Sequence, residues 1–198
     1  MKGNSWKYPF MLLILLVPVF IWSLINPVDY SVWFLETLPV IIGVILLIIF
    51  YRKFKFSNLT YIFIFLFMVF MLAGGHYAYG EVPLFNWIRD SFGLQRNHFD
   101  RFGHFLQGFV FALIFIEILI KKKVLNKKGI WLFIFPIALC LSLAVFTELF
   151  EWLVTIILRV DPDLYLGWQG DIWDAQWDML WNFIGALTSS LFYKFSIK

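Results

Sequence analysis

Acidic and histidine side chains recur near one end of four apolar segments of this chain. The last of these segments opens with Asp171, Asp174 and Asp178. If a helix begins at about Ile172, the three carboxylates lie on one stripe, because positions three and four apart share a helix face. Three earlier segments add ionisable groups at the same end: His76, Asp100, His104, Glu148 and Glu151. Ionisable groups at membrane depth are costly, and their recurrence predicts a functional site.

The side chains in this set are of the kinds that bind metal ions. An imidazole together with carboxylates suits Zn²⁺, Mn²⁺ or iron, whereas carboxylates alone suit Mg²⁺ or Ca²⁺. The candidate ligands are His104, Glu148, Asp174 and Asp178, with His76 as the next choice. Two alternatives stay open, namely a hydrogen-bond network that fixes helix packing and a metal-free binding or proton-relay site.

Other residues at this end are candidates for catalytic roles. Glu151 or Asp171 would act as a general base, and Arg101 would hold an anionic headgroup. Further polar residues complete the predicted site: Asp100, Gln107, Tyr77, Glu81 and Asn182. The sequence contains no H-E-x-x-H motif, P-loop, dinucleotide fingerprint or nucleophile elbow, so it does not indicate a reaction.

The composition is that of a polytopic membrane protein. Of the 198 residues, 62% are hydrophobic and only 15% are charged, whereas soluble domains are about half apolar and about a quarter charged. Apolar runs of about 18 to 25 residues predict six membrane spans, at 8–26, 33–51, 59–78, 101–120, 130–153 and 174–194. Because the connections are short, we expect one all-α transmembrane bundle over residues 1–198. No part of the chain is expected to bind nucleic acid.

The charges sort by side of the predicted membrane. One side holds all eleven lysines and Arg52 against a single acid, Glu117. The other side holds the remaining four arginines and twelve acids. Cytoplasmic loops carry the excess of Lys and Arg, so the pattern predicts that both termini are cytoplasmic and that the polar site faces outward.

Local patterns predict the connections and the packing. Between spans three and four, apolar residues at helical spacing predict a short amphipathic helix in the outer interface: Leu84, Trp87, Ile88 and Phe92. Asn97 is expected to cap span four. Span five is apolar as far as Leu158, so its helix would be about 29 residues long, or about 43 Å. Cys140 lies in the middle of that span and is interpreted as a packing residue.

Four motifs make the sequence similar to the YjdF-type bacterial inner-membrane proteins. The motifs are Gly-Gly-His-Tyr-x-Tyr-x-Glu-Val-Pro at 74–83, Asp-Arg-x-Gly-His-Phe-x-Gln-Gly-Phe at 100–109, Glu-x-x-Glu-Trp at 148–152 and Gln-Gly-Asp-x-Trp-Asp-x-Gln-Trp-Asp-Met at 169–179. The resemblance implies a bacterial cytoplasmic (inner) membrane location and the fold, but no chemistry. Its last motif adds Gln169 to the polar site.

A second, wider resemblance is to VanZ-like proteins. Their Asp-Lys-x-x-His-Phe pattern is similar to Asp100-Arg101-x-x-His104-Phe105, with arginine in place of lysine. Their Asp-x-x-x-Asn-x-x-Gly-Ala pattern is similar to the segment that begins at Asp178. This resemblance implies a shared helical core with an outward-facing polar site.

These observations lead to hypotheses of function from different classes. The first is a membrane-embedded enzyme, dependent on Zn²⁺, Mn²⁺ or Mg²⁺, that acts on a lipid or lipid-linked envelope molecule at the outer leaflet. The second is a non-enzymatic protein that binds or transports a cation, a proton-coupled solute or a lipid, and the third is a structural or interaction protein. A transport path has little support, because Glu117 is the one acid near the inner side and Lys121 is placed to pair with it. Spans three to six are expected to form the functional core, and the oligomeric state is not predicted.

Overall fold

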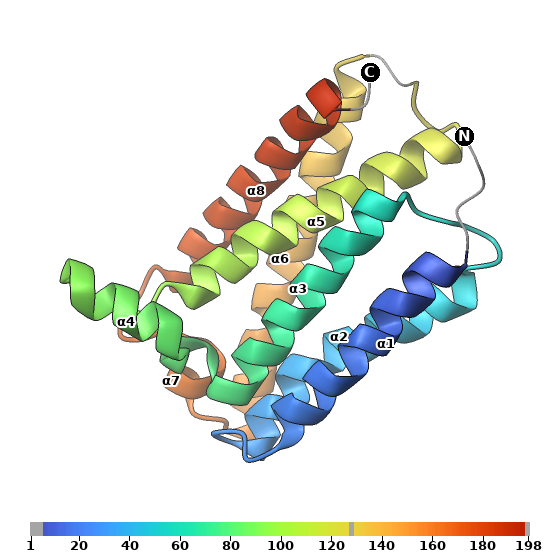
Figure 1. Ribbon diagram of the computed structural model, residues 1–198. Helices are drawn as coiled ribbons and strands as arrows, with labels where there is room; N and C mark the ends of the chain where they lie inside the picture. Colours follow the sequence, from blue (N-terminus) through green and yellow to red (C-terminus); the bar gives the residue numbers. More distant parts are fainter. Residues whose placement is uncertain (1–5, 127–128, 197–198) are drawn as a thin grey trace. The chain divides into compact units, whose positions relative to one another are not determined.

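The computed structural model describes residues 6–126 and 129–196, and within these ranges all regular structure is helical. Figure 1 shows the elements in chain order: α1 (Lys7–Leu24), α2 (Tyr30–Phe50), α3 (Asn58–Tyr77), the short 3₁₀ helix η1 (Tyr79–Glu81), α4 (Pro83–Phe92), α5 (Phe99–Lys121), α6 (Trp131–Leu158), α7 (Pro162–Tyr165) and α8 (Asp174–Ser196). The all-α prediction is confirmed.

Five of the described helices are long and apolar enough to cross a membrane, namely α1, α2, α3, α5 and α6. The sixth predicted span corresponds to α8, which has 23 residues. Its first three turns hold Asp174, Gln176, Asp178 and Asn182, so this half of the helix is polar. A sixth crossing and the orientation of the termini therefore stay predictions.

The chain divides into two compact units, Met1–Phe99 and Asp100–Lys198. In the first unit, α1 and α2 pack against α3. Asp29 begins α2, because its carboxylate accepts the backbone N–H groups of Ser31 and Val32 at 2.7 and 2.9 Å. The indole N–H of Trp33 donates to the Ser23 hydroxyl at 3.2 Å, which ties the start of α2 to the end of α1.

The short helix α4 has the amphipathic character that the sequence predicted. Its apolar residues Leu84, Trp87 and Phe92 are exposed. Asn97 joins this helix to α5, since its side-chain amide donates to the Val82 carbonyl at 3.1 Å and its side-chain oxygen accepts the N–H of Phe99 at 2.9 Å. The predicted capping role of Asn97 is confirmed.

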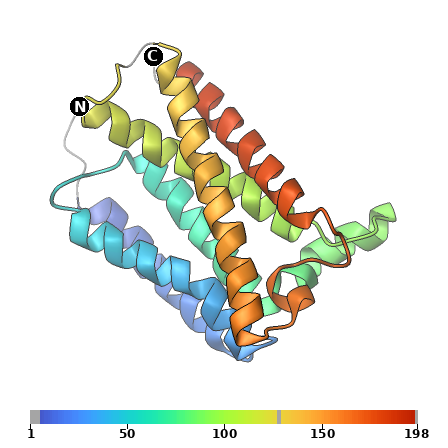
Figure 2. The same cartoon turned by 180° about the vertical axis from the view of Figure 1, so that it is seen from behind.

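The second unit is built from α5, α6 and α8, and Figure 2 shows α6 running beside α8. Glycine allows α5 and α8 to approach closely. A Cβ added at Gly108 would overlap the backbone carbonyl of Asn182, and one added at Gly185 would overlap that of Phe105. Small residues at an interface of this kind let two helix backbones approach closely.

Packing explains the position of the single cysteine. Cys140 is fully buried with Ala112 and Ala186, and its thiol lies 3.5 Å from the Gly108 carbonyl oxygen. The helix that carries it, α6, has 28 residues, close to the length predicted, and is about 42 Å long at 1.5 Å per residue.

Candidate functional site: a buried carboxylate–imidazole cluster

The centre of the site lies on the first turns of α5. Asp100 and His104 are one turn apart and are 7% and 8% exposed. The Nε2 atom of His104 lies 3.6 Å from an oxygen of Asp100 and 3.6 Å from an oxygen of Glu148 on α6. From α8, Asp178 reaches the same place and is only 2% exposed. We call these four residues the carboxylate–imidazole cluster.

Three members of this cluster have the spacing of metal ligands. One donor atom from each of Asp100, His104 and Asp178 lies within 4.8 Å of the other two. All three residues are buried. Within the described part of the chain, the Nδ1 atom of His104 and one carboxylate oxygen of Glu148 are buried and make no hydrogen bond. Buried polar atoms are nearly always satisfied; the Glu148 oxygen is the one that faces the cluster, 3.6 Å from the Nε2 atom of His104, and it could accept a bond from a ligand there.

Arg101 lies on the same turn of α5 and pairs with the start of α8. One guanidinium nitrogen lies 2.5 Å from Asp171 and 3.8 Å from Asp174. The guanidinium also packs over the Trp177 ring, 5.3 Å from its centroid. Arg101 therefore compensates two of the acids, and it is not a member of the carboxylate–imidazole cluster.

The last helix begins at Asp174, where the predicted span 174–194 also begins, and Asp171 lies in the preceding turn. The stripe argued from a helix start near Ile172 therefore keeps Asp174 and Asp178 but not Asp171. One oxygen of the Asp171 carboxylate accepts the backbone N–H of Trp173 at 2.9 Å, and its backbone carbonyl accepts the N–H of Asp174 at 3.1 Å. Asp171 thus satisfies the first N–H group of the helix and the N–H group just before it.

A second polar pair lies one turn further along α5 and α8. The side-chain amide of Asn182 donates to the side-chain oxygen of Gln107 at 2.7 Å. Asn182 is fully buried, and the close approach at Gly108 brings it against α5. This pair fixes the register of the two helices that carry the cluster.

Gly167 was not singled out from the sequence, yet its loop covers Asp100. The residue is buried and has a positive φ of 65°. An added Cβ would lie 3.0 Å from an Asp100 oxygen, so the loop backbone passes directly over the carboxylate. Gln169 supports this loop by donating to the Gly167 carbonyl at 3.3 Å. The signal in the sequence was a glycine between Leu166 and Trp168, which is typical of a tight turn but does not show which residue the turn covers.

Glu151 lies three residues beyond Glu148 on α6 and is partly exposed. It is not among the residues whose donor atoms converge within 4.8 Å. Its role as a general base stays a prediction.

Three predicted site residues belong to the first unit and have local contacts there. The Nδ1 atom of His76 lies 3.1 Å from the Ser23 carbonyl oxygen, and its ring lies 4.5 Å from the Trp22 ring. Tyr77 also contacts the Trp22 ring edge-on. Glu81 accepts a hydrogen bond from the Asn86 amide at 3.2 Å. Participation of His76, Tyr77 and Glu81 in a shared site stays a prediction.

Five carboxylates lie in the second-unit site, on α5, α6 and the start of α8: Asp100, Glu148, Asp171, Asp174 and Asp178. The Arg101 guanidinium pairs with two of them, Asp171 and Asp174. Carboxylates away from water need a counter-charge or a proton, and a bound cation is one way to supply it.

Comparison with known proteins gives a consistent result. Residues 8–198 match the protein family described as "Predicted membrane protein (DUF2238)". The chain belongs to this family. The inner membrane protein YjdF of Escherichia coli (strain K12) is 36% identical to it over 176 residues, which cover 88% of this chain and 83% of the relative. No solved structure matches the chain significantly.

Membership in the DUF2238 family confirms the predicted resemblance to YjdF-type proteins, and it agrees with the five apolar helices. The likeness to VanZ-like proteins stays a prediction. The family description names a membrane protein and no chemistry, so any function has to be argued from the carboxylate–imidazole cluster.

Proposed function

We propose that this protein of the bacterial inner membrane binds a divalent cation in the carboxylate–imidazole cluster. The observation that carries the proposal is the convergence of buried donor atoms from Asp100, His104 and Asp178 within 4.8 Å. Glu148 is the fourth candidate ligand, because its oxygen lies 3.6 Å from the same imidazole. A divalent cation would also attract the carboxylates of Asp100, Glu148 and Asp178.

The proposed ligand set differs from the sequence expectation at one position. Asp174 was expected to bind the metal, but its carboxylate lies 3.8 Å from the Arg101 guanidinium. Asp100 takes its place, because it lies one helical turn from His104 and within reach of Asp178. Mixed imidazole and carboxylate donors favour Zn²⁺ or Mn²⁺ over Mg²⁺.

The chemistry we propose is metal-dependent hydrolysis of a phosphate ester in a lipid or lipid-linked envelope molecule, in which water would add to phosphorus and the lipid alcohol would leave. A bound divalent cation polarises a phosphoryl or carbonyl oxygen and lowers the pKa of bound water. The charge pattern predicts that the end of α5 with the cluster faces the outer surface, near the lipid headgroups. Trp173 and Trp177 are exposed, and Trp177 packs against Arg101, in keeping with the aromatic belts that lie at headgroup level.

The second candidate function is non-enzymatic binding of a cation or lipid at the same cluster, and transport receives no support. A transporter needs polar groups that lead to the opposite surface. Towards the other end of α5, Glu117 accepts from Lys121 at 2.7 Å, which satisfies that acid locally.

Thermal unfolding with added metal tests the proposal. Purified protein treated with a chelator should unfold at a higher temperature after addition of Mn²⁺ or Zn²⁺, because a ligand that binds only the folded state stabilises it. His104→Ala should abolish this increase, whereas His98→Ala, which removes a histidine outside the cluster, should preserve it. Equal metal responses in the two variants would contradict the proposal.

A turnover assay distinguishes the enzyme hypothesis from the hypothesis of a non-enzymatic binding protein. The metal-loaded protein would be incubated in detergent with a lipid-linked phosphate, and phosphate release would be measured. Release that His104→Ala abolishes and His98→Ala preserves supports an enzyme. Metal binding without release supports the non-enzymatic alternative.

A further inference from the structure

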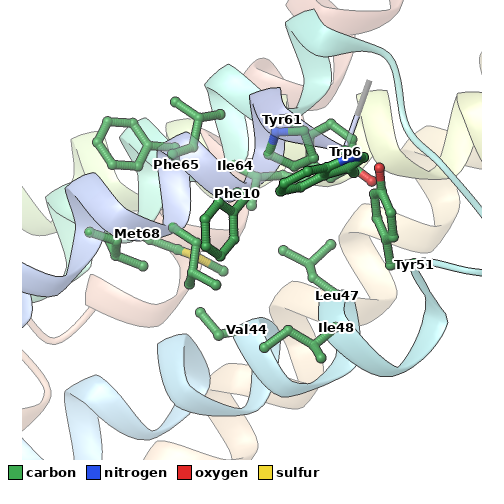
Figure 3. Close-up of a pocket in the computed structure, with 14 residues that line it drawn as sticks. Trp6, Phe10, Val44, Leu47, Ile48, Tyr51, Tyr61, Ile64, Phe65 and Met68 are labelled. Carbon is green, nitrogen blue, oxygen red and sulfur yellow. The ribbon is translucent and has the colours of Figure 1, made fainter. Parts of the chain in front are cut away.

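A separate cavity lies in the first unit, among α1, α2 and α3. Its volume is about 280 Å³. Figure 3 shows α2 side chains such as Val44 and Leu47 on one side, and α1 and α3 side chains such as Phe10 and Ile64 on the other. An apolar hollow of this size has room for a stretch of hydrocarbon, since engineered enclosed cavities of about 150 Å³ already bind small hydrocarbons.

The cavity lies far from the turn that joins α1 and α2. At that turn, the two helices are held together by the hydrogen bond from Trp33 to Ser23 and by the contact of the Phe20 and Trp33 rings. The residues that line the cavity come from the other ends of α1 and α2, at 6–16 and 44–51, and from α3, at 61–68. We call this hollow the wedge.

The rim of the cavity is open to its surroundings. Three of its apolar residues, Trp6, Phe10 and Ile48, are more than half exposed. In a membrane protein these side chains face lipid, so an acyl chain has direct lateral access. The cavity lining consists of aliphatic and aromatic residues, which suits a hydrocarbon and not a polar solute.

Polar and basic groups lie at the end of the wedge formed by Tyr51 and the residues that follow it. The hydroxyl of Tyr51 is a buried atom that makes no hydrogen bond within the described residues, although Tyr51 lines the cavity. The ammonium group of Lys55 lies 5.2 Å from the centroid of the Tyr51 ring. Arg52 and Lys53 follow Tyr51 directly and are exposed. A basic cluster beside a membrane helix attracts anionic headgroups.

We propose that the wedge among α1, α2 and α3 binds one acyl chain of an anionic phospholipid. The acyl chain fills the apolar cavity, the Tyr51 hydroxyl donates a hydrogen bond to an ester carbonyl oxygen, and the lipid headgroup lies against Arg52 and Lys55. The site is independent of the carboxylate–imidazole cluster and does not require a metal.

Native mass spectrometry of the delipidated, detergent-purified protein tests this site. The probes are phosphatidylglycerol and phosphatidylcholine with identical acyl chains. We expect one phosphatidylglycerol per chain, retained at a lower lipid concentration than phosphatidylcholine. Equal retention of the two lipids would overturn the assignment of the basic headgroup site.

Two tryptophan variants separate the cavity from general lipid contact. Leu47→Trp fills the cavity and should weaken phosphatidylglycerol binding about tenfold, because the acyl chain loses its buried methylene contacts. Ile49→Trp is the matched control, since Ile49 lies on the same helix, is 59% exposed and does not line the cavity. Equal binding by the two variants would overturn the proposal.

Two further variants address the polar end and guard against misfolding. Tyr51→Phe retains the ring and should weaken the binding of both lipids to a similar extent, by less than the tenfold expected for Leu47→Trp. Arg52→Gln combined with Lys55→Gln should remove the preference for phosphatidylglycerol while phosphatidylcholine binding is kept. If none of these variants changes lipid binding, the lipid assignment is wrong. It is also wrong if the mass spectra show a protein dimer in place of bound lipid and Leu47→Trp disrupts that dimer.

Discussion

At the scale of single residues, Asp178 distinguishes a metal site from a packing network. Asp178→Asn keeps the shape of the side chain and removes one of several neighbouring negative charges. Without metal, relief of this repulsion should leave thermal stability unchanged or raised. Affinity for Mn²⁺ should fall by more than about 10- to 100-fold, the range for loss of a residue that only orients a metal ligand, because Asp178 is proposed to bind the metal directly. The measurements are thermal unfolding in chelator and a Mn²⁺ titration.

The control for this variant is Asp163→Asn, because Asp163 is exposed on α7. This control variant should change neither the thermal stability of the metal-free protein nor its affinity for Mn²⁺. If Asp178→Asn instead lowered the stability of the metal-free protein and left Mn²⁺ affinity at the wild-type level, Asp178 would be a structural hydrogen-bond acceptor.

Arg101 is predicted to stabilise the start of α8. Its side chain is 11% exposed and pairs with Asp171 at 2.5 Å. Arg101→Gln should cost about 1.5–3 kcal/mol, the range for hydrogen bonds to charged groups, because Asp171 and Asp174 lose their counter-charge. In a double-mutant cycle with Asp171→Asn, the two losses should be markedly less than additive. Additive losses of stability would show that the pair of Arg101 and Asp171 contributes nothing to the free energy of unfolding.

At the scale of helices, the contact of α5 and α8 is predicted to depend on glycine. Gly108→Ala places a methyl group on the Asn182 backbone carbonyl, and overpacking of this kind costs about 1–3 kcal/mol. Gly43→Ala is the matched control, because its methyl group would meet only the flexible end of Met68 at 3.0 Å. Thermal unfolding in detergent should therefore show a clear loss for Gly108→Ala and little change for Gly43→Ala.

The helices themselves were predictable from sequence, whereas several contacts between them were not. Long apolar runs give the bounds of α1, α2, α3 and α5 to within a few residues, because a membrane span has a fixed minimum length. The predicted span 174–194 begins where α8 begins, but Asp171 was placed on the helical stripe, because an aspartate just before a helix and one in its first turn look the same in sequence. The glycines of α5 and α8 indicate close packing, but their spacing does not identify the partner helix.

At the scale of the whole chain, the charge pattern predicts which loops face the cytoplasm. In a Cys140→Ala background, Asp163→Cys should react with a membrane-impermeant maleimide in intact spheroplasts, and Lys123→Cys should react only after lysis. A cysteine appended after residue 198 should behave like Lys123→Cys if α8 completes a sixth span. Labelling of that terminal cysteine in intact spheroplasts would contradict the six-span topology.

The composition of the site also shows what a sequence alone provides. The acids and His104 were recognised because ionisable residues are rare in apolar segments. Their grouping was not predictable, since it depends on which helix faces meet: Asp100 joins the cluster, Asp174 lies against Arg101, and Gly167 covers Asp100. His76 has local contacts of its own with Ser23 and Trp22.

Elemental analysis of the purified protein tests the central claim most directly. The untagged protein would be extracted in detergent without added metal, beside Asp178→Asn and the control Asp163→Asn. We predict one equivalent of zinc or manganese in the wild type and in Asp163→Asn, and a loss of most of it in Asp178→Asn. No metal in any of the three, or the same amount in all of them, would contradict a cation site at Asp100, His104 and Asp178.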